Sequence, residues 1–166
     1  MTAWKTDTPM EVLTLGLQGE VFALEATHVR EILDLVPITG VPNSQPFIGG
    51  LINVRGKVVP LADLCLKFGM ELQPPTIDTR IVVTEVMIDG DPVIVGIRAD
   101  KVYEITQVAA SALEETPRIG MRWRPEYIRC IAKRGPEFIV VLDLERIFSR
   151  GDARDDAAGS SQRTAA

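Results

Sequence analysis

Residues 50–64, GLINVRGKVVPLADL, carry the most informative pattern in this chain. Two short apolar runs, 51–54 and 57–61, flank Arg55 and Gly56, and this arrangement predicts a β-hairpin. Gly56 can adopt the positive φ that the tip of a tight hairpin requires. The stretch therefore indicates a β fold built from short strands.

Polar side chains near the expected hairpin tip are candidates for binding. Because side chains alternate along a strand, we expect Asn53 and Arg55 on the same strand face. The Arg55 guanidinium is a planar fork suited to a carboxylate, either that of Glu31 or one on a partner. The residues alone leave open whether Glu31 and Arg55 form a structural ion pair or contact a partner. They also leave open whether Asn53 stabilises the turn or makes a contact.

Similar strands are expected on both sides of this hairpin. Alternation and turn residues predict them at 12–17, 21–24, 31–36, 80–88, 92–97, 103–108, 127–132 and 137–142. Short helices are expected at 62–68 and 143–148. The pattern Ser111-x-x-Glu114 resembles a capping box that would open one more helix. The fold class predicted is mainly β and barrel-like.

An internal duplication organises these elements. Three matches occur in the same order on either side of residues 69–78: 26–32 with 99–105, sharing A-x-x-V-x-E-I; 46–56 with 126–135; and 63–68 with 143–148, sharing D-L-x-x-x-F. The halves span about 11–68 and 79–148, and 1–10 and 149–166 are expected to be flexible termini. Units this small support only marginal cores alone, so the copies should pack together. A groove between packed subdomains is a common binding place.

The stretch 50–64 fits the string G-x-x-N-x-R-G-x-x-x-P-x-x-D-L at all seven fixed positions. This string resembles the signature of CheW-like domains, the coupling proteins of bacterial chemotaxis. The resemblance runs from about Glu11 to Phe148. It includes VREI at 29–32, VGIRAD at 95–100 and VVLDL at 140–144.

The resemblance implies two packed five-stranded SH3-like barrels with short helices, without catalytic activity, cofactor or metal. It implies a cytoplasmic adaptor that joins the histidine kinase CheA, through that kinase's own related regulatory domain, to the cytoplasmic tips of chemoreceptors. Such an adaptor would reach membrane receptor arrays through protein partners, without inserting into the membrane. In the family, the receptor tip binds near the residue matched by Val29. The partner-binding residues expected here are Val29, Glu31, Asn53, Arg55 and Gly56.

Composition disfavours several other classes of protein. The 166 residues carry 18 Lys and Arg against 23 Asp and Glu, a net charge of −5, which suits neither general nucleic-acid binding nor an anionic membrane surface. No apolar run approaches the ~18 residues that a membrane helix requires. His28 is the single histidine and Cys65 and Cys130 lie far apart, so a metal site is not expected.

Two alternative functions rest on local features. Residues 118–134 contain six cations against Glu126, with Trp123 and Tyr127 interleaved, as in a platform for single-stranded nucleic acid. A nucleic-acid-binding β-barrel is therefore the second hypothesis, although Tyr127 matches the core residue Phe47 in the duplication. A small hydrolase using Cys130 as its nucleophile is a more distant third.

Overall fold

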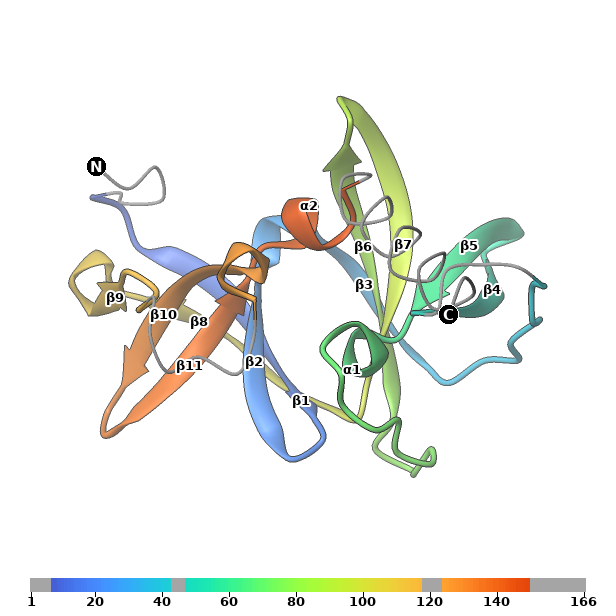
Figure 1. Cartoon of the computed structure of the whole chain (residues 1–166), viewed down its shortest axis with the longest axis horizontal. Coiled ribbons are helices and arrows are strands. Elements are labelled where there is room, and N and C mark those ends of the chain that lie inside the picture. Colours follow the sequence, from blue (N-terminus) through green and yellow to red (C-terminus); the bar gives the residue numbers. More distant parts are fainter. Residues whose placement is uncertain (1–6, 43–46, 118–123, 150–166) are drawn as a thin grey trace, which may run out of the picture.

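The computed structural model describes residues 7–42, 47–117 and 124–149. Within these residues the chain forms short strands, tight turns and very short helices (Figure 1). The elements are β1 (Met10–Leu17), β2 (Glu20–Glu25), η1 (Ala26–His28), β3 (Val29–Asp34), β4 (Ile48–Val54), β5 (Lys57–Ala62), α1 (Leu64–Lys67), β6 (Arg80–Ile88), β7 (Asp91–Ala99), β8 (Lys101–Val108), η2 (Ala110–Ala112), β9 (Leu113–Glu114), η3 (Pro125–Tyr127), β10 (Ile128–Arg134), β11 (Glu137–Leu142) and α2 (Leu144–Ile147).

The strands form two SH3-like barrels that lie side by side (Figure 1). One sheet has six strands in the order β8-β1-β2-β11-β10-β9, and the other has five in the order β3-β6-β7-β5-β4. The mainly β, two-barrel fold predicted from the sequence is confirmed, and the two-residue strand β9 is a sixth strand beyond the expected five.

Each barrel takes strands from both halves of the duplication. The hairpin β1–β2 of the first half pairs with β8 and β11 of the second, while the hairpin β6–β7 of the second half pairs with β3 and β5 of the first. The exchange is reciprocal, and the two parallel contacts, β2 with β11 and β7 with β5, are equivalent. Neither half can therefore complete a barrel without the other.

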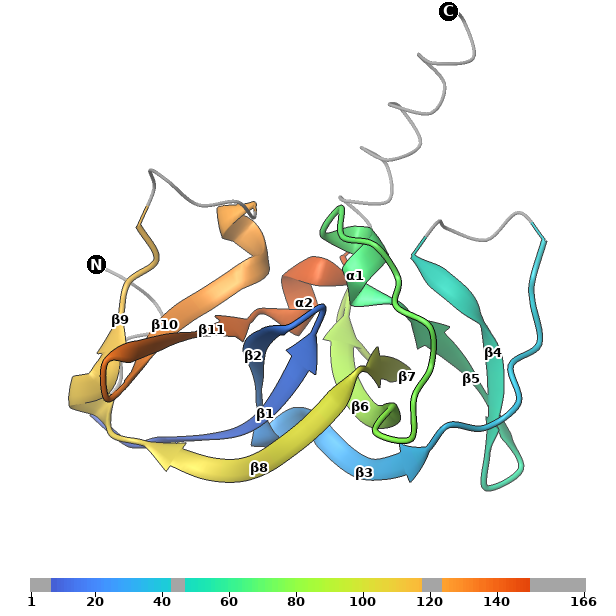
Figure 2. The ribbon, with the colours of Figure 1, turned by 90° about the horizontal axis from the view of Figure 1, so that it is seen from below.

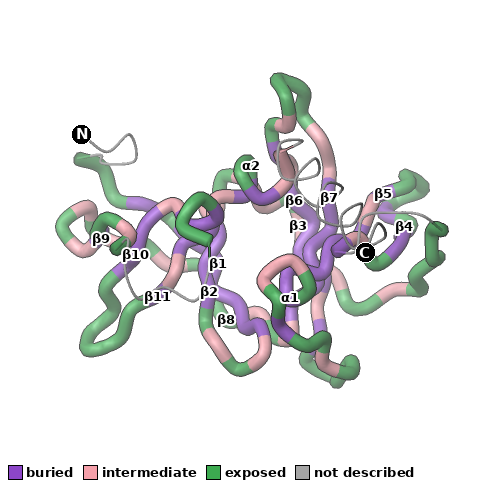
Figure 3. The backbone as a smooth tube through the Cα atoms, in the orientation of Figure 1, coloured by how far each residue is buried: buried purple, intermediate pink, exposed green. Residues whose placement is uncertain are grey.

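The largest apolar cluster joins the two barrels. It combines side chains from both hairpins with others from the two α-helices, including Leu15, Phe22, Leu64, Val82 and Leu144. Figure 3 shows buried backbone along β1, β2, β6 and β7, where the barrels meet. Each half alone is too small for more than a marginal core, and the two halves thus bury their apolar side chains in one shared core.

The backbone repeats closely between the halves. The N–H of Asp63 donates to the carbonyl of Phe47 at 2.7 Å, and the N–H of Asp143 donates to the carbonyl of Tyr127 at 2.8 Å. Strands β4 and β10 each carry a register shift near their start, at Ile48/Gly50 and at Ile128/Cys130. The matches made from sequence therefore correspond to equivalent structure.

The tip of the β4–β5 hairpin corrects one expectation. Arg55 and Gly56 both have positive φ, 52° and 83°, as the central residues of a type I′ turn do. Arg55 therefore lies in the turn and not in β4, so the alternation argument that placed it on one strand face with Asn53 is wrong. Two residues with positive φ reverse the chain, so the Arg55 side chain does not follow the two-residue alternation of the strand.

The capping box expected at Ser111 is also wrong. Residues 110–112 form a single turn of 3-10 helix, and Leu113 and Glu114 then pair with β10 as β9. Leu113 is 6% exposed in the core of the six-stranded barrel, and Glu114 forms an ion pair with Lys133 at 2.7 Å. Burial of Leu113 and this ion pair stabilise a strand here, and they outweigh the local preference for a helix capped by Ser111.

Candidate functional site

Arg55 and Glu31 form an ion pair at the tip of the β4–β5 hairpin. Arg55 Nη2 donates to Glu31 Oε2 at 2.8 Å, and Arg55 Nε lies 3.2 Å from each carboxylate oxygen. The hydrogen bond from Arg55 holds the pKa of the Glu31 carboxyl below its ordinary value, and that bond raises the pKa of Arg55. The Arg55 side chain is 80% exposed against 22% for Glu31. An ionised carboxylate thus fixes the direction of an exposed guanidinium.

The ion pair spans the seam of the five-stranded barrel. Strands β3 and β4 are the two edges of that sheet; Glu31 lies on β3, and Arg55 lies in the turn that follows β4. The side chains therefore link two edges that no backbone ladder joins. The structural role that the sequence left open for this pair is observed.

Asn53 and Gly56 shape the turn that carries Arg55. Asn53 Oδ1 accepts a hydrogen bond from the backbone N–H of Gly56 at 2.8 Å. Of the two roles that the sequence allowed for Asn53, turn stabilisation is therefore present, while the side chain stays exposed. Glu31, Asn53, Arg55 and Gly56 are thus brought together at one hairpin tip.

An equivalent ion pair occurs in the six-stranded barrel. Arg134 Nη2 donates to Glu104 Oε1 at 2.7 Å, joining β10 to the edge strand β8. Figure 2 shows β8 and β3 on the same side of the molecule, one in each barrel. The duplication aligns Glu104 with Glu31 and Arg134 with Arg55, so sequence matching could have indicated this second pair; it was not among the expected site residues.

Val29 lies on β3 before the others and has different surroundings. A register shift separates Val29, which pairs with Thr84, from Glu31, which pairs with Val83. Val29 is half-buried and packs against the core cluster that joins the barrels. It is therefore near the junction of the barrels, whereas Glu31 points to the hairpin tip. Val29 and Glu31 are close in the sequence but lie on different parts of the surface.

Glu85 and His28 flank Val29 and were not predicted as site residues. Arg30 forms an ion pair with Glu85, and His28 Nδ1 lies 3.2 Å from the Glu85 carbonyl oxygen. His28 is half-buried. Glu85 lies on β6, in the other half of the chain, and local sequence gives no signal that would place it here.

A groove adjoins the hairpin that carries Arg55. It has a volume of about 640 Å³ and lies between the β4–β5 hairpin, which supplies Asn53, Gly56 and Val58, and the segment after β3, which supplies Val36 and Pro37. Val58 is 75% exposed although it is apolar. The sequence did not single out Val58, because alternation in an apolar run does not say which face is covered.

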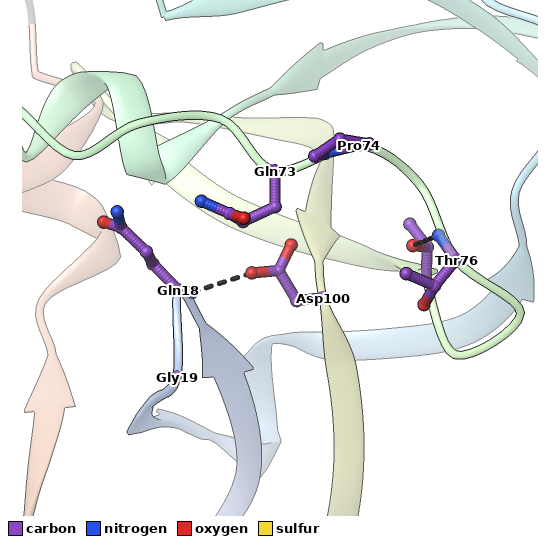
Figure 4. A pocket seen from close by; sticks show the side chains of 7 residues that line it. Gln18, Gly19, Gln73, Pro74, Thr76 and Asp100 are labelled. Carbon is purple, nitrogen blue, oxygen red and sulfur yellow. Dashed lines mark hydrogen bonds between the residues drawn. The ribbon is translucent and has the colours of Figure 1, made fainter.

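A second hollow lies between the β1–β2 turn and the segment after α1 (Figure 4). Its volume is about 470 Å³. The Asp100 carboxylate accepts a hydrogen bond from the backbone N–H of Gln18 at 2.7 Å, and Gln73 lies beside Asp100 in Figure 4. Asp100 therefore holds the β1–β2 turn against the junction of the halves.

The basic stretch offers little to a nucleic acid. Over residues 124–134 each cation has a carboxylate partner: Arg124 with Glu126, Arg129 with Glu25, Lys133 with Glu114 and Arg134 with Glu104. Tyr127 is 3% exposed, so its ring is closed to a stacking base. Arg118, Arg122 and Trp123 of this hypothesis lie outside the described residues.

The two cysteines are poor nucleophiles. Cys65 and Cys130 are free and buried. Burial raises the pKa of each thiol to about 11, so both remain protonated at neutral pH. In residues 7–42, 47–117 and 124–149, no group of three His, Cys, Asp or Glu residues could hold a metal ion. Within the same ranges, no helix has the length and apolar character needed to cross a membrane.

Two interlocked SH3-like barrels with an ion pair at each seam define a double-barrel class of β protein. The CheW-like domain model matches residues 11–152, and the chain belongs to this family. It is 29% identical over 143 residues to the probable chemotaxis protein CheW of Rhizobium etli, covering 86% of this chain and 90% of that one. It is 27% identical over 139 residues to the chemotaxis protein CheW of Klebsiella aerogenes, covering 84% and 81%.

A solved structure has the same fold. The scaffolding protein TtCheW from Thermoanaerobacter tengcongensis superposes with a TM-score of 0.75 at 29% identity. The match covers 85% of this chain and 93% of that one. The resemblance drawn from the stretch 50–64 is therefore confirmed at the level of family and fold.

Proposed function

We propose that this protein is a non-catalytic chemotaxis adaptor that couples a CheA-type histidine kinase to the cytoplasmic tips of chemoreceptors. Membership of the CheW-like family supports an adaptor role, as do relatives described as chemotaxis proteins and as a scaffolding protein. Buried, protonated thiols agree with a role in binding rather than in chemistry. The adaptor acts in the cytoplasm and reaches receptor arrays through its protein partners.

The observation that carries the proposal is the exposed Arg55 guanidinium, in a turn whose neighbouring residues Asn53 and Gly56 line the groove. Glu31 engages Nε and Nη2, and a guanidinium has five N–H donors in a planar fork. Donors on the outer side remain available to a carboxylate of the partner, and the neighbouring apolar Val58 can be covered at the same time. We assign Glu31, Asn53, Arg55 and Gly56 to this protein contact.

Val29 belongs to the second contact of the proposal. It is half-buried against the core that joins the barrels, where an apolar partner helix can extend that core. We assign the receptor tip to this place. An adaptor with two separate contacts holds kinase and receptor at high effective concentration. Contacts that differ between receptor signalling states then change the activity of the kinase.

Charge reversal at Arg55 tests the assignment. Arg55→Glu places two carboxylates at the hairpin tip, so we expect loss of kinase binding or of receptor control over kinase activity in a reconstituted receptor–kinase assay. Arg134→Glu is the matched control, because it breaks the same kind of ion pair on the other barrel. Circular dichroism checks that both variants fold. Normal kinase control with folded Arg55→Glu would contradict the role given to Arg55.

A further inference from the structure

The second hollow, between the β1–β2 turn and the segment after α1, contains one charged side chain (Figure 4). Its lining consists of Gln18, Gly19, Gln73, Pro74, Thr76, Thr79 and Asp100. Among these described residues only Asp100 carries a charge, so the lining has no cation that would attract an anion. The volume of about 470 Å³ lies within the usual range of ligand pockets. The lining therefore favours a ligand that is positively charged and rich in hydrogen-bond donors.

Asp100 is held in a fixed position but is not neutralised. Its backbone N–H donates to the carbonyl of Gly16 at 2.9 Å, and its carboxylate Oδ2 accepts from the N–H of Gln18 at 2.7 Å. In the part of the chain that the structure describes, the carboxylate has no ion pair and its Oδ1 has no hydrogen bond. Two bonds to the β1–β2 hairpin thus orient the carboxylate, and one of its oxygens remains available to a ligand.

The two cations close to Asp100 in the sequence are engaged elsewhere. Arg98 is 9% exposed, and its Nη2 donates to the carbonyl of Gln73 at 2.6 Å. The Lys101 ammonium lies 5.4 Å from the centroid of the Tyr103 ring. The bond from Arg98 fixes the segment that forms the opposite wall of the hollow. One cation therefore supports that wall, and neither pairs with the Asp100 carboxylate.

The duplicated fold does not require a carboxylate at this position. The alignment of 26–32 with 99–105 places Thr27 at the position of Asp100. The opposite wall, residues 73–79, connects the two copies and has no counterpart in the duplication. Asp100 therefore stands where the other copy has a neutral residue, and it faces a wall that the other copy lacks. Both differences indicate a role for the carboxylate beyond orienting the β1–β2 turn.

A guanidinium fits these groups better than a metal ion does. Ca²⁺ takes about six to eight oxygen ligands, whereas the lining holds the single carboxylate of Asp100. A guanidinium carries five N–H donors in a planar fork that pairs with a carboxylate. The side-chain amide oxygens of Gln18 and Gln73 can accept further donors, and Pro74 offers an apolar surface to an aliphatic stem. The ligand class is therefore a guanidinium on an aliphatic chain.

The turn beside the hollow indicates that the guanidinium belongs to a protein. Ile77 lies between the lining residues Thr76 and Thr79 and is 90% exposed. Its turn is ordered, because the N–H of Thr76 donates to Thr79 Oγ1 at 2.8 Å and Arg80 Nη1 donates to the carbonyl of Ile77 at 2.8 Å. A partner chain that carries the cation can also cover this fixed apolar side chain, and little ordering entropy is lost. A free small cation would leave Ile77 in water.

We propose that the second hollow binds an arginine side chain of a protein partner. The guanidinium pairs with Asp100, the aliphatic stem lies along Pro74, and apolar residues of the partner cover Ile77. The site shares no residue with the contacts proposed at Arg55 and at Val29, so this inference is independent of the partners assigned above.

Amide NMR of the full chain tests the site with N-acetyl-L-arginine methylamide as the probe. We expect saturable shifts of the amides of Gln18, Gly19 and Thr76. N-acetyl-L-citrulline methylamide has nearly the same shape without the charge, so it should bind at least about fivefold more weakly. Asp100→Asn keeps an oxygen for the N–H of Gln18 but removes the charge, so it should weaken binding of the arginine probe by about fivefold as well.

Asp78→Asn is the matched control, because Asp78 is exposed near the hollow but does not line it. It should leave the affinity for the arginine probe within about twofold. Should Asp100→Asn fail to fold, as judged by its amide spectrum, the comparison of the two probes on the unmodified protein decides the question. Equal binding of the two probes, or equal effects of the two variants, would overturn the site. Tighter binding of putrescine than of the arginine probe would also overturn it, because the ligand would then be a free amine.

Discussion

Arg134 donates to Glu104 at 2.7 Å across the seam of the six-stranded barrel, in the place that Arg55 and Glu31 occupy on the other barrel. The two pairs differ in how the arginine is presented. Arg134 is the last residue of β10 and its side chain is 52% exposed, whereas Arg55 lies in a turn with positive φ and is 80% exposed. The shared ion pair belongs to the duplicated fold, and the projecting Arg55 distinguishes the proposed docking surface.

Removal of the Arg55 guanidinium should raise the pKa of Glu31. The hydrogen bond from Arg55 is the main reason that this pKa lies below 4.5, so Arg55→Ala should return it toward that value. A depressed carboxyl pKa contributes stability above the unfolded-state pKa, and that contribution is lost as the pH falls through the folded-state value. The stability difference between the two proteins should therefore shrink below about pH 4.5.

Carboxyl ¹³C NMR across a pH titration measures this pKa directly. Arg134→Ala provides the comparison, because it should leave the titration of Glu31 unchanged. An unaltered Glu31 titration in Arg55→Ala would show that the pair does not persist in solution.

Gly50→Ala should destabilise the five-stranded barrel. Gly50 has a φ of 147°, and a Cβ there would lie 2.4 Å from the carbonyl oxygen of Thr39. Thr39 cannot retreat easily, because it exchanges two backbone hydrogen bonds with Leu51. We expect the free energy of unfolding to fall by at least about 2 kcal/mol in urea denaturation. Gly40→Ala is the control, since a Cβ at Gly40 meets nothing within 4 Å; equal effects would contradict the explanation.

Phe68 should contribute much more to stability than its neighbour Leu66. The Phe68 ring, just after α1, contacts Phe22 and Tyr127, with centroids 5.9 Å away in each case, whereas Leu66 within α1 is 41% exposed. Phe68→Ala should cost about 2–3 kcal/mol because its ring is half-buried, and Leu66→Ala less than about 0.5 kcal/mol. Thermal unfolding of both variants checks the difference, and similar melting temperatures would argue against a bridging role for Phe68.

Both thiols should react slowly with disulfide reagents in the folded protein. A pKa of about 11 in place of 9.0 lowers the thiolate fraction near neutral pH by about 100-fold, and burial slows access further. Ellman's reagent at pH 7.5 should modify Cys65 and Cys130 at least about 100-fold more slowly than in urea. Fast modification of Cys130 in the native protein would revive the hypothesis of a nucleophile.

Sequence patterns predicted the structure best where the residues that cause a turn or helix lie within the same short stretch. Gln18-Gly19 and Asp89-Gly90 lie between strands that were expected from the sequence, and all four residues have the positive φ of tight turns. The duplicated D-L-x-x-x-F stretches were expected to be helices, and each is a single turn preceded by aspartate. Local patterns failed at Ser111, because the pairing of Leu113 with the distant strand β10 outweighed the local preference for a capped helix.

The sequence by itself determined the strands, most of the turns, the duplication and the family, because alternation, turn residues and repeated strings are properties of neighbouring residues. The tertiary structure alone decided which copy supplies each strand of a barrel. Two similar copies present the same apolar faces. A barrel built from the strands of one copy therefore satisfies the same local pattern as a barrel built from strands of both copies. It also decided that Arg55 meets Glu31 from a turn, and that the Asp63 carboxylate is buried without capping α1 while Asp143 caps α2. Those outcomes depend on space and charge contributed by residues far away along the chain.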